Sequence, residues 1–332
     1  MRPEIIEYAD DLPVKVYIRD VENWPYHWHN AVEIIMVLEG QVTIGLGGET
    51  HLLKQDDIAV VNVNEIHRIE KSGGGNKLLI IQIDADFCAS AIPDFQFTFF
   101  QCCSTYHEDQ AQGKYIATKA AVLQLVSWLI EYPGECKKLN ILDCLDELLG
   151  EMAGSFDYLR YGNGIDAFDE KQVQRYKRIY ECAVNPSGKN HTLTELAEML
   201  GISMQHLSHD IKAKFGLSYQ ELLFCGKCMK AARLLLGTDK LVRGIAAECG
   251  FSDEKYLVKH FKLNYYCTLS DFRKKYKDGE PLAYKEWPLS SFRGKILESL
   301  SALESSMRNF EADNTIGNAA QYMKIPILPK TT

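Results

Sequence analysis

The chain has 332 residues, of which 46% are hydrophobic and 25% are charged, and its net charge is −8. This composition is that of an ordinary globular protein, and the length suits two or three domains. No apolar run reaches the roughly 20 residues that span a bilayer, and the N-terminal MRPEIIEYADDLPVK carries acids where a signal peptide would be apolar. We therefore expect a cytoplasmic protein with no membrane partner and with reduced cysteines.

The charge is divided unevenly along the chain. Residues 1–160 carry 12 Lys and Arg against 25 Asp and Glu, whereas residues 189–277 carry 15 against 9. A polyanion such as DNA is repelled by the first part and attracted by the second. Residues 189–277 are therefore the candidate for nucleic-acid binding.

Short β-branched runs bounded by Gly, Asn and Asp predict strands from Val14 to about Ile83. These runs are VKVYI, AVEIIMVLEG, QVTIGLGGE, HLLKQDDIAVVNV and NKLLIIQID, and the LGGE between two of them is typical of a hairpin turn. The regular spacing predicts a small antiparallel β-barrel. Next, TKAAVLQLVSWLIEY and NILDCLDELLGEMAGSF have helical spacing, which predicts a helical hairpin whose spare apolar surface is either core or a dimer interface.

A weak internal repeat occupies residues 192–276, first as TLTELAEMLGISMQHLSHDIKAKFG and then as LVRGIAAECGFSDEKYLVKHFKLNY. Each copy predicts a helix, a glycine turn and a second helix. Gly201 and Gly250 permit a positive φ, and Ser203 and Ser252 are placed to cap the second helix. This is the helix-turn-helix unit, whose second helix fits the major groove of double-stranded DNA.

The predicted domains follow from these patterns. Residues 1–160 form the barrel and the helical hairpin, residues 161–188 a linker and connecting helix, and residues 189–277 the double helix-turn-helix domain. Residues 278–332 are an extension of unknown role, in which PLSSFRGKILESLSALESSMRNF predicts an amphipathic helix. That helix packs back on the molecule, pairs in a dimer or is partly disordered.

The chain resembles the AraC/XylS family of bacterial transcription regulators. The resemblance covers Thr192 to Tyr276, including IAAECGFSDEKYLVKHFK and SDFRKKY, and HWHNAVEIIMVLEGQVTI and VNVNEIHRI are similar to the cupin-type sensor barrel of many members. It implies an α+β two-domain fold: a cupin- or jelly-roll-like barrel with a helical hairpin, then an all-α domain with two helix-turn-helix units. It also implies a homodimer formed through residues 119–160 and RNA polymerase as a further partner. Where the family has FGMTP this chain has YYCTL, so that Tyr266 replaces a glycine and Leu269 a proline.

The resemblance also implies which side chains contact DNA. They lie opposite the apolar stripes of the two recognition helices, although any one of them can instead be only solvated. The expected base contacts are Gln205, Ser208 and His209 in the first helix, and Glu254, Lys255 and Lys259 in the second. The expected phosphate contacts are Lys212, Lys214, Lys262, Arg273, Lys274 and Lys275.

The stretch YHWHNAVEIIMVLEG places His27, His29 and Glu33 on one face of a strand, and a neighbouring strand can bring His67 to them. The spacing matches the cupin metal pattern, so these residues hold zinc, manganese, iron or nickel, or an effector, or only each other. We expect an effector site with no cofactor and no catalytic residue. The expected effector-binding residues are His27, His29, Glu33, Tyr17, Trp24, Tyr26, Asn62, Asn64, His67 and Gln82.

The sequence therefore predicts a transcription regulator, not an enzyme, that responds to a small-molecule effector. Indole and phenol rings together with amides suit a sugar. Two alternatives stay open. One is a cupin metalloenzyme such as a dioxygenase or isomerase, and the other is a constitutive DNA-binding protein whose barrel only dimerises.

Overall fold

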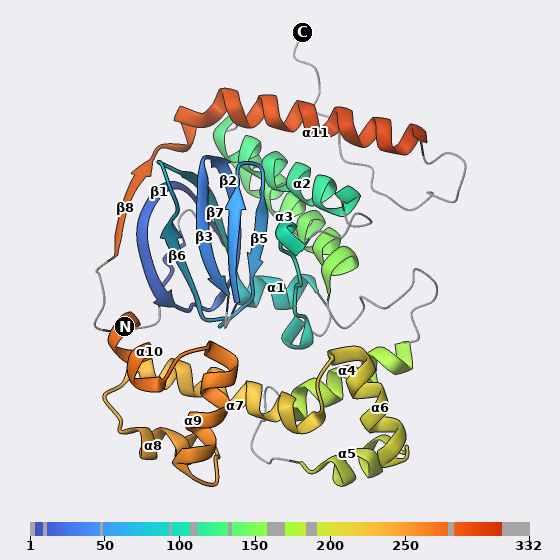
Figure 1. The fold of residues 1–332 in the computed structure, drawn as a ribbon. Coiled ribbons are helices and arrows are strands. Elements are labelled where there is room, and N and C mark those ends of the chain that lie inside the picture. Colours follow the sequence, from blue (N-terminus) through green and yellow to red (C-terminus); the bar gives the residue numbers. More distant parts are fainter. Residues whose placement is uncertain are drawn as a thin grey trace.

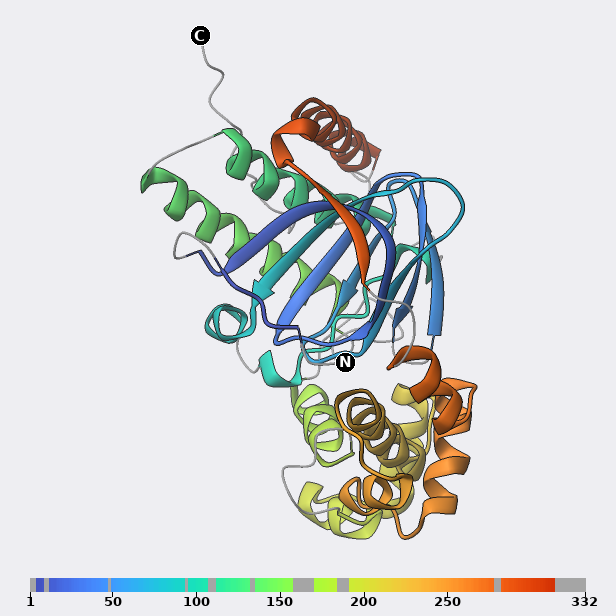
Figure 2. The same cartoon turned by 90° about the vertical axis from the view of Figure 1, so that its left-hand side faces the viewer.

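The structure, a computed structural model, has a β-barrel above a helical part, and the chain then returns to the barrel (Figures 1 and 2). The described residues are 4–8, 12–46, 49–92, 95–106, 112–131, 135–157, 170–183, 191–277 and 282–313. Of the predicted linker and connecting helix at residues 161–188, residues 161–169 and 184–188 lie outside them, as do residues 189–190 and 314–332.

Antiparallel strands form the near-closed barrel, as predicted. They are β1 (Val14–His27), β2 (Ala31–Glu39), β3 (Gln41–Leu46), β4 (Glu49–Lys54), β5 (Ile58–Val61), β6 (His67–Lys71), β7 (Lys77–Asp84) and β8 (Ala283–Trp287). The order is β4-β3-β6-β1-β7-β2-β5, with β8 paired to β1. The long β1 pairs first with β7 and then with β6, and its register shifts between Trp24 and His27.

Turn chemistry sets several strand ends. Strands β3 and β4 pair as the predicted hairpin, although the two glycines of its turn lie outside the described residues. HLLKQDDIAVVNV forms two strands rather than one, because the chain turns at Asp56, which has a φ of 69°. Gly40 ends β2 with a φ of 74°, and a Cβ there would lie 2.2 Å from the Gly75 carbonyl oxygen. Only glycine fits this turn.

The two faces of the barrel wall have separate cores. The inner face packs rings and β-branched side chains such as Tyr17, Trp24 and Ile35. The outer face of β2 and β7 packs against helices, which continue the same core. The elements on this side are α1 (Ala85–Ala91), η1 (Phe95–Phe97), η2 (Ser104–Tyr106), α2 (Gln112–Glu131) and α3 (Glu135–Phe156). The predicted helical hairpin is α2 with α3.

The C-terminal extension packs back on the barrel. After β8 come η4 (Leu289–Phe292) and α11 (Arg293–Asp313), which lies along α2 (Figure 1). Ile296 and Leu300 of α11 are buried in the same core as the helical hairpin. The amphipathic helix is therefore confirmed, and it covers part of the apolar surface that we expected to be core or dimer interface.

The helix-turn-helix part contains α4 (Glu170–Ala183), α5 (Leu193–Leu200), α6 (Met204–Phe215), α7 (Tyr219–Gly237), α8 (Val242–Glu248), α9 (Glu254–Tyr265) and α10 (Leu269–Tyr276). The turn glycines are confirmed, with φ values of 65° at Gly201 and 70° at Gly250. Ser203 caps α6, but capping by Ser252 is wrong: α9 begins one position later, and Asp253 accepts the N–H of Tyr256. None of the described helices is long and apolar enough to cross a membrane.

Candidate DNA interface and barrel site

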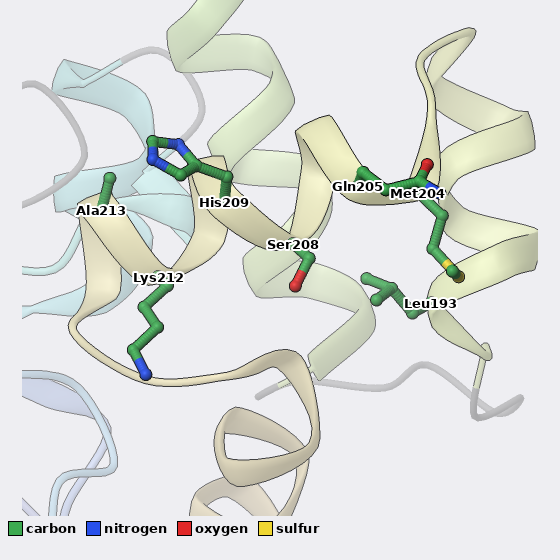
Figure 3. A pocket seen from close by; sticks show the side chains of 7 residues that line it. All are labelled: Leu193, Met204, Gln205, Ser208, His209, Lys212 and Ala213. Carbon is green, nitrogen blue, oxygen red and sulfur yellow. The ribbon is translucent and has the colours of Figure 1, made fainter.

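The first recognition helix, α6, has one buried side and one exposed side. Leu207 and Ile211 are fully buried in the core of the first unit, which also includes side chains of α4. Gln205, Ser208 and His209 are exposed. They line an open hollow on the outer face of α6, shown in Figure 3, together with Leu193, Met204, Lys212 and Ala213. The three predicted base contacts of this helix therefore share one solvent-facing side.

The second recognition helix, α9, repeats this arrangement. Leu257 and Phe261 are buried in the core that α9 forms with α7, α8 and α10. The predicted base contacts Glu254, Lys255 and Lys259 are all exposed.

The predicted phosphate contacts fall into two groups. Lys212, Lys262, Lys274 and Lys275 are exposed. Arg273 is half-buried and donates to the carbonyl oxygens of Lys240 at 2.7 Å and Leu235 at 3.4 Å. Lys214 lies over the Tyr176 ring, and burial lowers its pKa. These two side chains are thus engaged within the domain.

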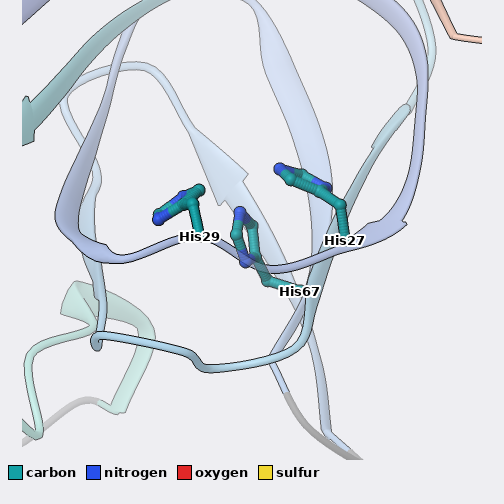
Figure 4. A group of neighbouring side chains, drawn as sticks. All are labelled: His27, His29 and His67. Carbon is teal, nitrogen blue, oxygen red and sulfur yellow. The ribbon is translucent and has the colours of Figure 1, made fainter. Parts of the chain in front are cut away.

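Three imidazoles and a carboxylate converge at the mouth of the barrel. We call His27, His29, Glu33 and His67 the histidine cluster; Figure 4 shows its three rings. His27 ends β1, Glu33 lies in β2 and His67 begins β6, while His29 lies just beyond β1. The ring centroid of His67 lies 4.0 Å from that of His27 and 5.0 Å from that of His29. All four side chains are buried.

Hydrogen bonds orient the side chains of the histidine cluster but leave several of their buried polar atoms without a hydrogen-bond partner. Glu33 Oε2 accepts from Gln82 Nε2 at 2.7 Å and lies 3.1 Å from His29 Nε2. The Nδ1 atoms of His27 and His67 lie 2.9 and 3.0 Å from backbone carbonyl oxygens of Pro25 and Glu65. The buried atoms left without a hydrogen-bond partner include His27 Nε2, His29 Nδ1, Glu33 Oε1 and His67 Nε2.

The charges of the histidine cluster depend on burial and on its own members. Burial, together with the neighbouring His67, lowers the pKa of His27 to about 4. Burial alone would raise the pKa of Glu33, but His29 and His67 hold that pKa well below its usual value. Burial alone would lower the pKa of His29, yet the hydrogen bond to Glu33 raises it. At neutral pH the cluster therefore contains an ionised carboxylate beside a neutral His27.

The other predicted effector residues are not all at the histidine cluster. Gln82 is, and the Tyr17 hydroxyl is buried on the inner face without a partner. Trp24 stacks on His27 at 5.1 Å. The remaining three point elsewhere: Tyr26 lies on the outer face, Asn62 bonds the backbone of Phe100, and Asn64 is exposed at a turn.

Sequence reasoning missed Glu4. Its Oε2 atom lies 3.4 Å from His27 Nε2, and it forms a possible ligand group with His29 and Glu33. A single acid in the N-terminal segment carries no pattern that would have indicated this position.

The N-terminal part contacts both helix-turn-helix units, through the barrel at the second and through η1 at the first. Tyr26 stacks on Phe272 with ring centroids 5.6 Å apart and meets Tyr276 edge to face at 4.5 Å. The Arg68 guanidinium lies 5.5 Å from the Tyr26 ring and 5.8 Å from the Tyr276 ring. We call these four side chains the α10 contact. At the first unit, Phe97 of η1 packs against the core that contains α4 and α6.

Comparison with known families agrees with this arrangement. The model of an AraC-like ligand binding domain matches residues 19–160, and the model of a helix-turn-helix domain matches residues 196–275. The chain belongs to the AraC family. This AraC-family chain accordingly combines an N-terminal AraC-like ligand binding domain with a helix-turn-helix domain that follows it.

Several curated proteins are similar to this AraC-family chain. It is 22% identical to the HTH-type transcriptional activator RhaS of Yersinia pestis (strain Pestoides F) over 80% of this chain and 95% of RhaS. It is 22% identical to the virulence regulon transcriptional activator VirF of Shigella flexneri over 74% of this chain and 91% of VirF. The Bacillus subtilis (strain 168) regulator YfiF is 37% identical over 28% of this chain. The chain spans only 29% of YfiF and 30% of a similar Staphylococcus aureus regulator.

Among solved structures, the AraC-family chain is similar to ToxT from Vibrio cholerae strain SCE256 bound to an unsaturated fatty acid. The TM-score is 0.44 and the identity 10%, over 83% of this chain and 100% of that chain.

Proposed function

We propose that this chain is a ligand-responsive transcription regulator in which both recognition helices contact operator bases and a ligand at the histidine cluster alters how the second helix-turn-helix unit is held. The observation that carries the proposal is the α10 contact. Tyr26 and Arg68, which immediately precede and follow two members of the histidine cluster, pack against the last helix of the DNA-binding domain. A ligand that alters the conformation at the end of β1 and the start of β6 can therefore act directly on that domain.

The exposed side chains of α6 and α9 suit base edges. Gln205 can pair in bidentate fashion with adenine, and Lys255 and Lys259 can reach guanine O6 and N7. Ser208 and His209 can donate or accept, and Glu254 can accept from a cytosine amine. The four exposed lysines named above are assigned to phosphates, whereas Arg273 and Lys214 are assigned to the stability of the domain.

A sugar is not part of this proposal. Sugar binding was predicted from aromatic rings that can stack on the ligand, but Trp24 stacks on His27 and on Tyr284, and Tyr26 faces α10. The proposal assigns no catalytic role to the chain. It keeps the homodimer and the contact with RNA polymerase as predictions, with part of the expected dimer surface now covered by α11.

The test is genome-wide mapping of the DNA sites bound by the full chain, followed by fluorescence anisotropy on a recovered site. We expect discrete sites that share a motif, and a Lys255→Ala variant that loses affinity for them. The proposed function is wrong if the full chain enriches no shared motif and binds every duplex equally.

A further inference from the structure

We propose that the ligand of the histidine cluster is one divalent transition-metal ion, and that its binding acts on α10 through Tyr26 and Arg68. This inference rests on the proposed function, because it names the chemical class of the ligand at the same site. It goes further in assigning the ligand atoms and the two side chains that pass the signal.

The residue types and their burial indicate a metal site. The ligand atoms of His27, His29 and His67 all lie within 4.8 Å of one another. Glu33 adds a carboxylate whose Oε1 atom is buried without a hydrogen-bond partner. Three imidazoles and one carboxylate suit zinc, manganese, iron or nickel, whereas magnesium and calcium prefer oxygen ligands. Buried polar atoms without hydrogen-bond partners are costly, and four of them in one place suit a site that binds a cation.

The position of the ring protons in His27 and His67 also favours a metal site. A backbone carbonyl can only accept, so the Nδ1 atoms of His27 and His67 carry the protons that Pro25 O and Glu65 O receive. The Nε2 atom is then the nitrogen of each ring whose lone pair is available to a metal ion when the ring is neutral. His67 Nε2 lies 3.4 Å from Glu33 Oε1, and His27 Nε2 lies 3.4 Å from Glu4 Oε2. A cation bound between these nitrogen and oxygen atoms would be attracted to both.

The surroundings match the supporting shell of a metal site. Metal-binding histidines usually donate their second N–H to a carbonyl or carboxylate, which fixes the ring orientation. Gln82 does the same for the carboxylate, since it donates to Glu33 Oε2 and leaves Oε1 facing the rings. These contacts hold His27, Glu33 and His67 in place from outside the histidine cluster, and His29 is held by Glu33 within it.

The distances between the ligand atoms indicate how metal binding would act on the DNA-binding domain. In a tetrahedral site with metal–nitrogen bonds of about 2.1 Å, ligand atoms lie about 3.4 Å apart. The histidine nitrogens, which lie within 4.8 Å of one another, would have to close by up to about 1.4 Å. His27 and His67 are already register partners where β1 meets β6, so closure brings their rings together and rearranges the backbone at the register shift of β1. Tyr26 and Arg68, their chain neighbours on the outer face, then move against α10.

The first experiment measures metal binding by the full chain. The protein is stripped with a chelator, dialysed against Zn²⁺, Mn²⁺, Fe²⁺ or Ni²⁺, and analysed for metal content and unfolding temperature. We expect one equivalent of at least one metal and a higher unfolding temperature. His67→Gln should lose the bound metal, while His51→Gln, a barrel histidine outside the histidine cluster, should keep it. If His67→Gln does not fold, His29→Gln takes its place. The proposal is overturned if the wild type binds no more metal than the ligand variant.

The second experiment measures signal transfer to DNA. Operator affinity of the full chain is compared with and without the bound metal. We expect a change of at least about five-fold in the wild type, the lower end of ordinary allosteric coupling. Tyr276→Ala should bind the metal as the wild type does and should show the same DNA affinity in both forms. An unchanged wild-type affinity, or a Tyr276→Ala response equal to that of the wild type, would overturn the route through α10.

The two experiments separate this inference from the proposed function. A chain that binds its operator but no metal keeps the regulatory function and loses the metal proposal. A chain that binds metal but no specific DNA loses the regulatory function, whereas its metal content still supports the site.

Discussion

The rings of Tyr26 and Tyr276 meet edge to face, with centroids 4.5 Å apart and planes at 84°. Tyr26 precedes a histidine of the barrel cluster, and Tyr276 is the last residue of α10. This single contact therefore joins the candidate ligand site to the DNA-binding domain across 250 positions of the sequence.

A double-mutant cycle on this pair should show a favourable coupling energy. Edge-to-face aromatic pairs contribute about 0.5–1.5 kcal/mol beyond their burial. We expect this value when Tyr26→Ala, Tyr276→Ala and the double variant are compared by urea unfolding. Tyr276→Phe, which keeps the ring, should behave as the wild type. Additive effects of the two alanine changes would mean that the contact does not hold the domains together.

Replacement of His209 should separate specific from general DNA binding. His209→Ala is expected to weaken operator binding by about 1–3 kcal/mol and to leave binding to unrelated DNA unchanged. Lys212→Ala, one turn away on the same hollow, should weaken both and reduce the salt dependence by about one unit. Anisotropy titrations at several salt concentrations measure both effects. Equal weakening on both duplexes by His209→Ala would remove its assignment to a base.

Tyr266 should be a source of strain that glycine relieves. It caps α9 with a φ of 54°, in the left-handed region where a side chain costs about 1–2 kcal/mol. Because its side chain is mostly exposed, Tyr266→Gly removes little packing, and we expect a gain of about 1 kcal/mol in unfolding free energy. The reverse change at the matching position, Gly216→Ala, with a φ of 69°, should destabilise the fold. A loss of stability on Tyr266→Gly would show that the ring makes a needed contact.

Truncation of a buried side chain in α11 should destabilise the barrel. Ile296 is fully buried in the core that β2, β7, α2 and α3 share. Ile296→Ala is expected to cost about 2–5 kcal/mol in chemical unfolding. The exposed Glu298→Ala, on the same helix, is the control and should change stability by less than about 0.5 kcal/mol. A small effect at Ile296 would mean that α11 is not part of the folded core.

The helix-turn-helix units could be predicted because their signals are local. A glycine with positive φ between two apolar periodicities of 3.6 residues determines the turn and both buried faces, and the apolar residues of the two second helices, such as Leu207 and Leu257, are buried as this period requires. The capping position was the exception. Ser252 and Asp253 both suit an N-cap, and the start of α9 decided between them.

The barrel site could be predicted only in part, because strand register and the pairing of strands far apart in the sequence do not follow from local sequence patterns. The shift between Trp24 and His27 in β1 places Trp24 and His27 inside and Tyr26 outside, which strict alternation does not allow. Likewise, β8 was missed because AYKEW becomes a strand only by pairing with β1. Glu4 reaches His27 for a similar reason, from a segment with no strand of its own.

The pairing of β8 with β1 makes the sensor a discontinuous domain. Its described elements come from two stretches of chain, β1 to α3 and β8 to α11, and the DNA-binding helices are inserted between them. Two covalent connections instead of one therefore join the helix-turn-helix units to the barrel. A sensor fragment that stops after α3 would leave β1 without β8 and α2 without α11, so the isolated sensor has to be assembled from both stretches.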